Sequence, residues 1–264
     1  MTKTISGLFL AGLSLFLSSC KRNDIEGSEC AASKVLFFVS GATPAEEAHY
    51  TYTDGRVSEA RFMYLRLRYS YDGQGRVVRR EQYHGIDPDL KEFDIVTYDA
   101  GNRPGQVEHY IKTYAGTERV DSILFRYQGG QLIEQLYYHR MSWPAPMDLY
   151  FRQRFTYAGN NISQNIHDYY VDNQLVASDT ARFSADNLPN HYATLHPQYF
   201  LYHPFGMFPS GFSWYFRTTT ANNLLQTGTS PGSTREEYLT DERGRLAEYR
   251  VDGTPYLRFD YSCR

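Results

Sequence analysis

The sequence lacks any block of five or six charges of one sign, and its formal net charge is only −3. A mildly acidic chain without a basic run is a poor ligand for phosphates, so nucleic acid is excluded as the main partner. Helical periodicity is also missing, because no window of eleven or more residues repeats its apolar positions at helical spacing. These absences favour an all-β protein.

Catalytic motifs are missing as well. The chain contains no Gly-x-Ser-x-Gly, no His-Glu-x-x-His and no phosphate loop. Three histidines, His191, His196 and His203, have spacings that match no structural zinc site, and we interpret them as imidazoles packed among aromatic rings. We therefore expect no enzymatic activity, no cofactor and no metal.

The N-terminus carries a targeting signal. Lys3 precedes an apolar run from Ile5 to Leu17, which is too short to span a bilayer and has the length of a signal peptide. The sequence Leu17-Ser18-Ser19-Cys20 that follows resembles the bacterial lipobox. The resemblance implies that residues 1–19 are removed, that Cys20 is lipidated and that the protein is anchored in a membrane. Lys21 after the cysteine favours the outer membrane, at its periplasmic face or at the cell surface. The alternative is an ordinary secretory signal with an incidental cysteine.

Cysteine is scarce, with three copies in all. If Cys20 carries lipid, Cys30 and Cys263 remain, and an oxidising compartment favours a disulfide bond between them. In the chain-entropy model such a long closed loop stabilises by roughly 5 kcal/mol. Two free thiols or an intermolecular bond are the alternatives.

A short pattern recurs along the chain: an aromatic residue, a turn of Asp, Gly or Asn, and then an aliphatic residue. Tyr69-Ser70-Tyr71-Asp72-Gly73-Gln74-Gly75-Arg76-Val77 is the fullest copy. Gly, Asn and Asp accept the positive φ that tight hairpin turns require, so each copy predicts a hairpin. Other copies begin at Tyr52, Tyr98, Tyr127, Tyr157, Phe183, Thr219 and Tyr238.

Between the turns the apolar residues alternate with polar ones. Leu65, Leu67 and Tyr69 share one face, while Arg66 and Arg68 share the other. Leu149, Phe151, Phe155 and Tyr157 repeat this pattern, as do Leu257, Phe259, Tyr261 and Cys263 near the C-terminus.

These copies resemble the YD-repeat family (Rhs-type repeats), and the chain is similar to uncharacterised YD-repeat-like lipoproteins common in Bacteroidota. Tyr71-Asp72 with Gly75-Arg76-Val77, and Tyr238 with Asp241 and Gly244-Arg245-Leu246, carry the resemblance best. It implies consecutive antiparallel hairpins in a curved sheet, without the closed cocoon that long arrays form.

We predict an all-β fold, with about fourteen to sixteen strands in an antiparallel meander that forms a curled, open or partly closed barrel-like sheet. Residues 20–33 are predicted to be a lipidated cysteine and a polar tether, and residues 34–264 a single domain. The first and last strands should meet.

An aromatic insertion at 191–217 interrupts the pattern, with three prolines that exclude a central strand. It either forms a platform for a sugar or peptide or fills an open end of the sheet. Flat amphipathic rings suit a platform. The candidate ligand-binding residues are Trp143, Tyr199, Tyr202, Trp214 and Tyr215.

The functional prediction is a non-catalytic, membrane-anchored envelope lipoprotein that acts as a binding or scaffold module, with glycan or peptide as ligand. One alternative is an envelope hydrolase that acts on glycan through carboxylates such as Asp87 or Glu236. Another is a structural subunit of a cell-surface complex. The sequence does not predict the ligand or the oligomeric state.

Overall fold

A computed structural model describes residues 30–37, 44, 46–62, 64–85, 87, 89–140, 145–190, 222–227 and 236–263. All regular structure in these ranges is β-strand, which confirms the predicted all-β class. The described residues include no helix long and apolar enough to cross a membrane.

Sixteen strands form the fold. In chain order they are β1 (Cys30–Phe37), β2 (Glu46–Thr53), β3 (Arg56–Phe62), β4 (Leu65–Tyr71), β5 (Val77–His84), β6 (Glu92–Tyr98), β7 (Pro104–Thr113), β8 (Gly116–Gln128), β9 (Gln131–His139), β10 (Asp148–Ala158), β11 (Asn161–Val171), β12 (Gln174–Pro189), β13 (Asn222–Thr227), β14 (Glu236–Thr240), β15 (Leu246–Val251) and β16 (Thr254–Cys263).

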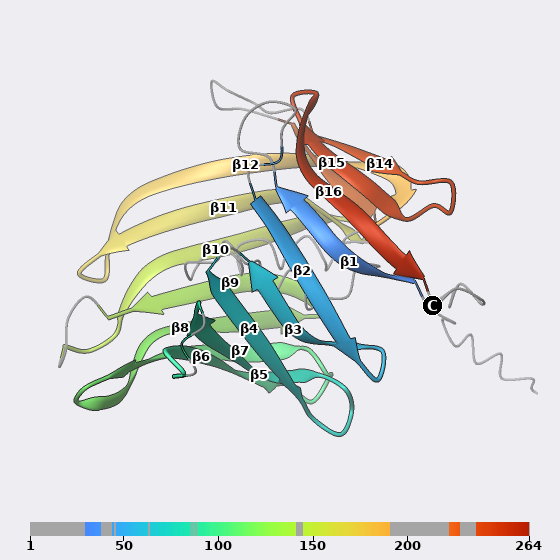
Figure 1. The fold of residues 1–264 in the computed structure, drawn as a ribbon. Coiled ribbons are helices and arrows are strands. Elements are labelled where there is room, and N and C mark those ends of the chain that lie inside the picture. The colour runs from blue at the N-terminus through green and yellow to red at the C-terminus, as the bar shows by residue number, and fades with distance from the viewer. Residues whose placement is uncertain are drawn as a thin grey trace, which may run out of the picture.

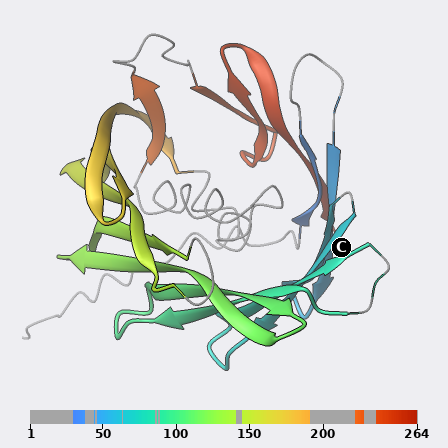
Figure 2. The ribbon, with the colours of Figure 1, turned by 90° about the vertical axis from the view of Figure 1, so that its left-hand side faces the viewer.

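The strands make one antiparallel sheet that curls around an axis (Figures 1 and 2). From β1 to β13 each strand pairs with the next one in the chain, as predicted for a meander. The order is broken once, because β14, β15 and β16 join at the other end of the sheet, where β16 pairs with β1. We call the β1–β16 pairing the seam. The prediction that the first and last strands meet is confirmed, and β13 and β14 are the two edges of an open sheet.

In such a meander the hairpin turns alternate between the two ends of the sheet. One end, the polar rim, carries the turns of β2–β3, β4–β5, β6–β7, β8–β9, β10–β11 and β14–β15 (Figure 1). The opposite end, the apolar rim, carries the connections of β3–β4, β5–β6, β7–β8, β9–β10, β11–β12 and β15–β16. Every recurring turn that the structure describes as a hairpin lies at the polar rim.

Three polar-rim turns share one hydrogen-bond network, shown here for Asp72. Its Oδ1 accepts the backbone N–H groups of Gln74 and Arg76, both at 2.9 Å, and its Oδ2 accepts Arg76 Nε at 2.7 Å. Gly75 follows with a φ of 79°, and a Cβ there would lie 2.6 Å from Arg56 Nη2. The turns at Asp99 and Asp241 repeat the contacts. The Asp-to-Arg spacing is therefore the sequence code of this turn.

Neighbouring turns are tied to one another through tyrosine. The register shifts by one residue at Tyr98, whose hydroxyl donates to the Val77 carbonyl of the preceding hairpin at 2.9 Å. The Arg76 guanidinium stacks 4.4 Å from the centroid of the Tyr98 ring. Similar hydroxyl bonds join later and earlier hairpins, through Tyr52, Tyr71, Tyr127, Tyr157 and Tyr261. Tyr71, Tyr98, Tyr127 and Tyr157 thus each fasten their own hairpin to the preceding one.

One face of the sheet carries the hydrophobic core, and we call it the inner face. Val107, Ile123, Leu132, Phe155 and Leu257 belong to this cluster, each at most 5% exposed. The predicted alternation is confirmed, because Leu67 and Tyr69 are buried on this face while Arg66 and Arg68 occupy the other. Burial of these side chains supplies the main driving force for curling.

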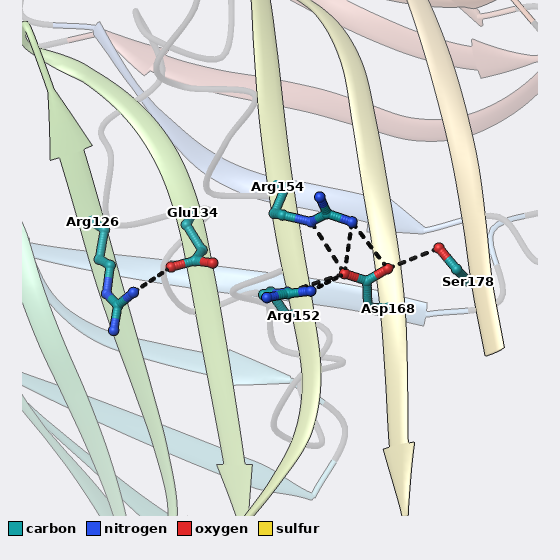
Figure 3. A network of polar contacts seen from close by, with 6 residues as sticks. All are labelled: Arg126, Glu134, Arg152, Arg154, Asp168 and Ser178. Atoms are coloured by element: carbon teal, nitrogen blue, oxygen red, sulfur yellow. Dashed lines mark hydrogen bonds and ion pairs between the residues drawn. The ribbon is translucent and has the colours of Figure 1, made fainter. Parts of the chain in front are cut away.

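The opposite, outer face is covered by ion pairs across strands. On β11, Asp168 accepts hydrogen bonds from Arg152, Arg154 and Ser178, and on β9 Glu134 pairs with Arg126 at 2.8 Å (Figure 3). Burial raises the pKa of Asp168, but Ser178 and the two arginines outweigh it and hold the pKa below its ordinary value. Opposite charges on adjacent strands also fix the register.

Three sequence predictions need correction. The copy at Thr219 predicts a turn at Asn222 and Asn223, but both residues belong to strand β13. The copy at Phe183-Leu188 forms no hairpin, because β12 runs through it and pairs with β13, with only an irregularity between Ala185 and Pro189. Its Asp and Asn residues lack the Asp-to-Arg spacing of the turns at Asp72, Asp99 and Asp241. In addition, β1 begins at Cys30, so the last part of the predicted tether (20–33) is a strand.

Candidate ligand-binding patch

Polar residues interrupt the inner face near the middle of strands β9, β10 and β11. Gln135 on β9 faces Gln153 on β10, which in turn faces His167 on β11, and Asn165 lies two residues before this histidine. A polar residue on an inward position costs free energy unless it finds a hydrogen-bond partner. These four residues are therefore the part of the core that needs an explanation.

His167 sets the orientation of the amides beside it. Its Nε2 accepts a hydrogen bond from Asn165 Nδ2 at 3.1 Å. It also accepts one from Gln153 Nε2, at very short range. Two amide donors require an accepting Nε2, so the ring is neutral with its proton on Nδ1, facing Asp179 Oδ1 at 3.8 Å. Burial lowers the pKa of His167, in agreement with a neutral ring.

Because the amide nitrogens of Gln153 and Asn165 face His167, their amide oxygens point away from it. Gln153 Oε1 and Asn165 Oδ1 have no hydrogen-bond partner among the described residues, and neither does Gln135 Nε2. The three residues are only 1%, 3% and 2% exposed, respectively. An unpaired buried polar atom costs about 1–3 kcal/mol, so this amide trio is a set of donors and acceptors that a ligand could satisfy.

Aromatic rings continue from the amide trio towards the apolar rim. Phe151 lies 4.8 Å from Tyr137 and 6.3 Å from His167, measured between ring centroids. Tyr150 contacts Tyr137 edge-on at 5.8 Å, and Tyr169 contacts His167 at 6.1 Å. Tyr150 and Tyr169 are 46% and 38% exposed. We call these rings and the amide trio the aromatic–amide patch, which grades from buried amides to exposed tyrosines.

A carboxylate closes the patch on its β8 side. Asp121 Oδ1 accepts the Tyr137 hydroxyl at 2.5 Å and lies 2.6 Å from His139 Nδ1. Burial, followed by the charge of Asp121, raises the pKa of Tyr137, so the phenol keeps its proton and the ring stays fixed. The position of the aromatic row therefore depends on this buried carboxylate.

Further along the inner face a buried ion cluster joins β5, β6 and β7. Asp94 is fully buried and lies 2.5 Å from Arg80 Nε and 2.7 Å from His109 Nδ1. Burial raises the pKa of Asp94, but the neighbouring Arg80 and His109 outweigh it and hold the pKa down. A carboxylate that stays charged and paired stabilises a strand register better than it transfers protons.

The sequence-predicted site residues fall almost entirely outside the described residues. This holds for Cys20, Trp143, Tyr199, Tyr202, Trp214 and Tyr215 and for the insertion at 191–217. Asp87 is described: it pairs with Lys91 Nζ at 2.8 Å in a half-exposed turn. For Glu236 and for both Cys30 and Cys263 the structure gives the backbone position, and Cys30 lies opposite Cys263 across the seam.

Sequence reasoning missed the amide trio, although a signal was present. Gln153 stands between Phe151 and Phe155, at a position that the period of two assigns to the apolar face. A polar residue in that register is detectable from the alternation of side chains alone. No three His, Cys, Asp or Glu side chains form a metal-binding group in the part of the chain that the structure describes.

Comparison with known proteins identifies no family. No family model matches the chain, and no curated relative matches it. Among solved structures, a porin-like protein from Bacteroides vulgatus ATCC 8482 is 10% identical, with a TM-score of 0.44 over 89% of this chain and 98% of that one. A porin-like protein from Bacteroides uniformis ATCC 8492 is 14% identical, with a TM-score of 0.40 over 88% and 96%. A DUF3836 family protein from Bacteroides vulgatus ATCC 8482 is 19% identical, with a TM-score of 0.29 over 33% and 91%. At these values no shared function follows.

Proposed function

We propose that the protein is a non-catalytic, membrane-anchored binding module of the cell envelope, and that its ligand is a neutral glycan bound at the aromatic–amide patch. The lipobox-like Leu17-Ser18-Ser19-Cys20 supports the anchor and the envelope location. The observation that carries the binding role is the amide trio, with its unpaired donor and acceptor atoms next to half-exposed tyrosines.

The chemistry of the trio selects the ligand class. It offers one free amide NH₂ group with two donor hydrogens, from Gln135, and two free oxygen acceptors, from Gln153 and Asn165. A carboxylate or phosphate only accepts and would leave both oxygens unpaired, while an ammonium group only donates. Sugar hydroxyls donate and accept, and the apolar faces of a sugar ring pack on tyrosine. A peptide also donates and accepts, but it does not need a row of flat rings.

The titration of the carboxyl groups supports a non-catalytic role. A glycosidase needs one carboxyl whose pKa is raised, so that it can act as an acid. Among the described residues, every carboxyl whose pKa is clearly shifted has a pKa below its ordinary value. These residues are Glu59, Asp72, Glu81, Asp87, Asp94, Asp99, Asp168, Asp241 and Glu248. The hydrolase alternative also relied on Asp87, which is held by Lys91.

Binding to an array of neutral oligosaccharides, followed by calorimetry of any positive sugar, tests the proposal. The chain is used with Cys20→Ser, which removes the acylation site. Gln153→Met keeps the side-chain volume but removes the amide, and we expect it to weaken sugar binding about tenfold. Gln164→Met, on the opposite face of β11, is the matched control and should bind as the parent does. Failure of every sugar to bind, or equal loss in both variants, would contradict the proposal. If peptides bind and no sugar does, the ligand class is peptide and not glycan.

A further inference from the structure

Among the described strands, the seam is the one pairing between strands that are not consecutive in the chain. Every other pair of neighbours in the sheet is consecutive in the chain, so a turn or a connection holds it together. β1 and β16 are separated by nearly the whole sequence, yet their register runs from Phe37 opposite Leu257 to Cys30 opposite Cys263. Bringing such distant segments together carries the largest loop-closure entropy in the fold.

Two of the three cysteines in the chain occupy one register position of this seam. Directly opposed residues of antiparallel strands have Cα atoms about 4.5 or 5.5 Å apart, depending on their hydrogen bonding. Both values fall in the range of about 4.4–6.8 Å that a disulfide bond spans. The register therefore places the two Cα atoms in the range that a disulfide bond requires.

Strand periodicity places both positions on the same face. Position 30 is two residues from Ala32, and position 263 is two residues from Tyr261, and Ala32 pairs with Tyr261 across the seam. Ala32 is buried and Tyr261 packs against the core cluster. The two cysteines thus occupy the inner-face row at the polar-rim end of the seam.

We propose that Cys30 and Cys263 form an intramolecular disulfide bond that locks β14, β15 and β16 onto the N-terminal part of the sheet. Two thiols lose two protons and two electrons, one S–S bond forms, and the disulfide of an envelope thiol–disulfide oxidoreductase accepts the electrons and becomes a dithiol. The bond acts where the tertiary structure has no hairpin, so its loss should loosen the three C-terminal strands as a unit.

The test uses the full chain exported to the periplasm and purified without reductant. Intact mass is measured before and after reduction, and unreduced peptides are mapped. We expect the unreduced protein to be lighter by two hydrogens, with one cross-linked peptide pair that contains Cys30 and Cys263. Alkylation of both cysteines without reductant would overturn the proposal, as would a bond to Cys20 or between two chains.

Measuring the stability of the protein with and without reductant tests whether the disulfide bond supports the fold. Reduction should lower the Tm of the parent on the order of 10 °C and increase hydrogen exchange in β14–β16. Cys30→Ala, Cys263→Ala and the double variant should show the same loss, because any one of them removes the whole bond. The double variant should not respond to reductant. A parent whose Tm and exchange are unchanged by reduction would contradict the locking role.

Discussion

The polar and apolar rims of the sheet differ in what their residues contact. At the polar rim, Asp72, Asp99 and Asp241 each hold their own turn, and the recurring tyrosines bond across to adjacent hairpins. At the apolar rim, the exposed large hydrophobic side chains gather at strand ends and connections. They are Tyr64, Tyr114, Tyr150, Tyr169, Val171, Leu175, Val176 and Tyr256, and among the described residues only Leu239 is exposed elsewhere.

This difference separates folding from recognition. A turn whose side chains bond to its neighbours is constrained in sequence, because each residue has a partner to satisfy. A connection whose side chains point into solvent is free to carry binding residues. The aromatic–amide patch adjoins this free rim, through Tyr150 and Tyr169. One end of the sheet thus specifies the repeat, and the other is available for a ligand.

In the comparison of the two rims, the largest effect is expected from the polar-rim aspartates. Asp99→Ala removes the acceptor of two backbone N–H groups and of Arg103, so unfolding free energy should fall by about 2 kcal/mol and Tm by about 6 °C. Asp87→Ala, at the apolar rim, removes a half-exposed pair with Lys91 and one exposed hydrogen bond from the Asp89 backbone N–H, so Tm should fall by at most about 2 °C. Thermal unfolding of both variants checks the contrast, and equal Tm losses would abolish it.

At the aromatic–amide patch, we expect a substitution to lower sugar binding and to leave stability unchanged. Tyr169→Ala removes an exposed ring and should weaken sugar binding about tenfold, while Tm stays close to that of the parent. Tyr256→Ala, exposed to a similar extent but on β16, is the control and should bind normally. Calorimetry and thermal unfolding on the same samples give both readouts. A Tyr169 variant with parental affinity would remove this ring from the site.

A smaller effect follows from the tyrosine hydroxyls. Tyr98→Phe deletes only the hydrogen bond to the Val77 carbonyl, so unfolding free energy should fall by about 1 kcal/mol. Tyr114→Phe makes the same chemical change on a fully exposed ring at the apolar rim and should have no effect. Urea unfolding resolves the difference. Indistinguishable midpoints would show that the tyrosine hydroxyl bonds between hairpins add nothing to stability.

The pH dependence should differ between the two regions. The folded pKa of His167 lies below its ordinary 6.5, so the unfolded chain takes up this proton first. Its contribution to stability is complete above pH 6.5 and is lost as the pH falls through the lowered pKa. A protonated Nε2 no longer accepts the amides, so sugar affinity should fall in the same window. Calorimetry on His167→Gln, which should lose this pH dependence, is the check.

The polar-rim carboxylates respond only to stronger acid. Backbone and side-chain donation from Arg76 lowers the pKa of Asp72 below its ordinary 3.8. Its contribution is present above pH 3.8 and is lost as the pH falls through the lowered folded value. Unfolding curves should therefore show the turns intact at a pH where the patch has already changed. Simultaneous loss of both would contradict this separation.

The sequence predicted the polar rim well and the patch poorly, for a physical reason. Asp72 and Gly75 act within one turn, so their spacing alone encodes the structure. Gln153 acts through Gln135 and His167 on other strands, and the register that brings them together depends on irregularities such as the one between Leu149 and Phe151. The Phe183–Leu188 segment failed for a related reason, since its turn-like residues were overridden by pairing with β13.

The place where β1 begins sets a distance from the membrane. Cys30 lies at the polar rim, and the nine residues between it and Cys20 allow a reach of at most about 35 Å. If Cys20 carries lipid, the polar rim lies within about 35 Å of the bilayer surface. The amide trio lies about half a strand length farther out, roughly 15 Å along a nine-residue strand such as β9, and Tyr150 and Tyr169 lie nearer the far end. Under the proposed function, the sheet would act as a spacer that presents the aromatic–amide patch to polymers beyond the lipid headgroups.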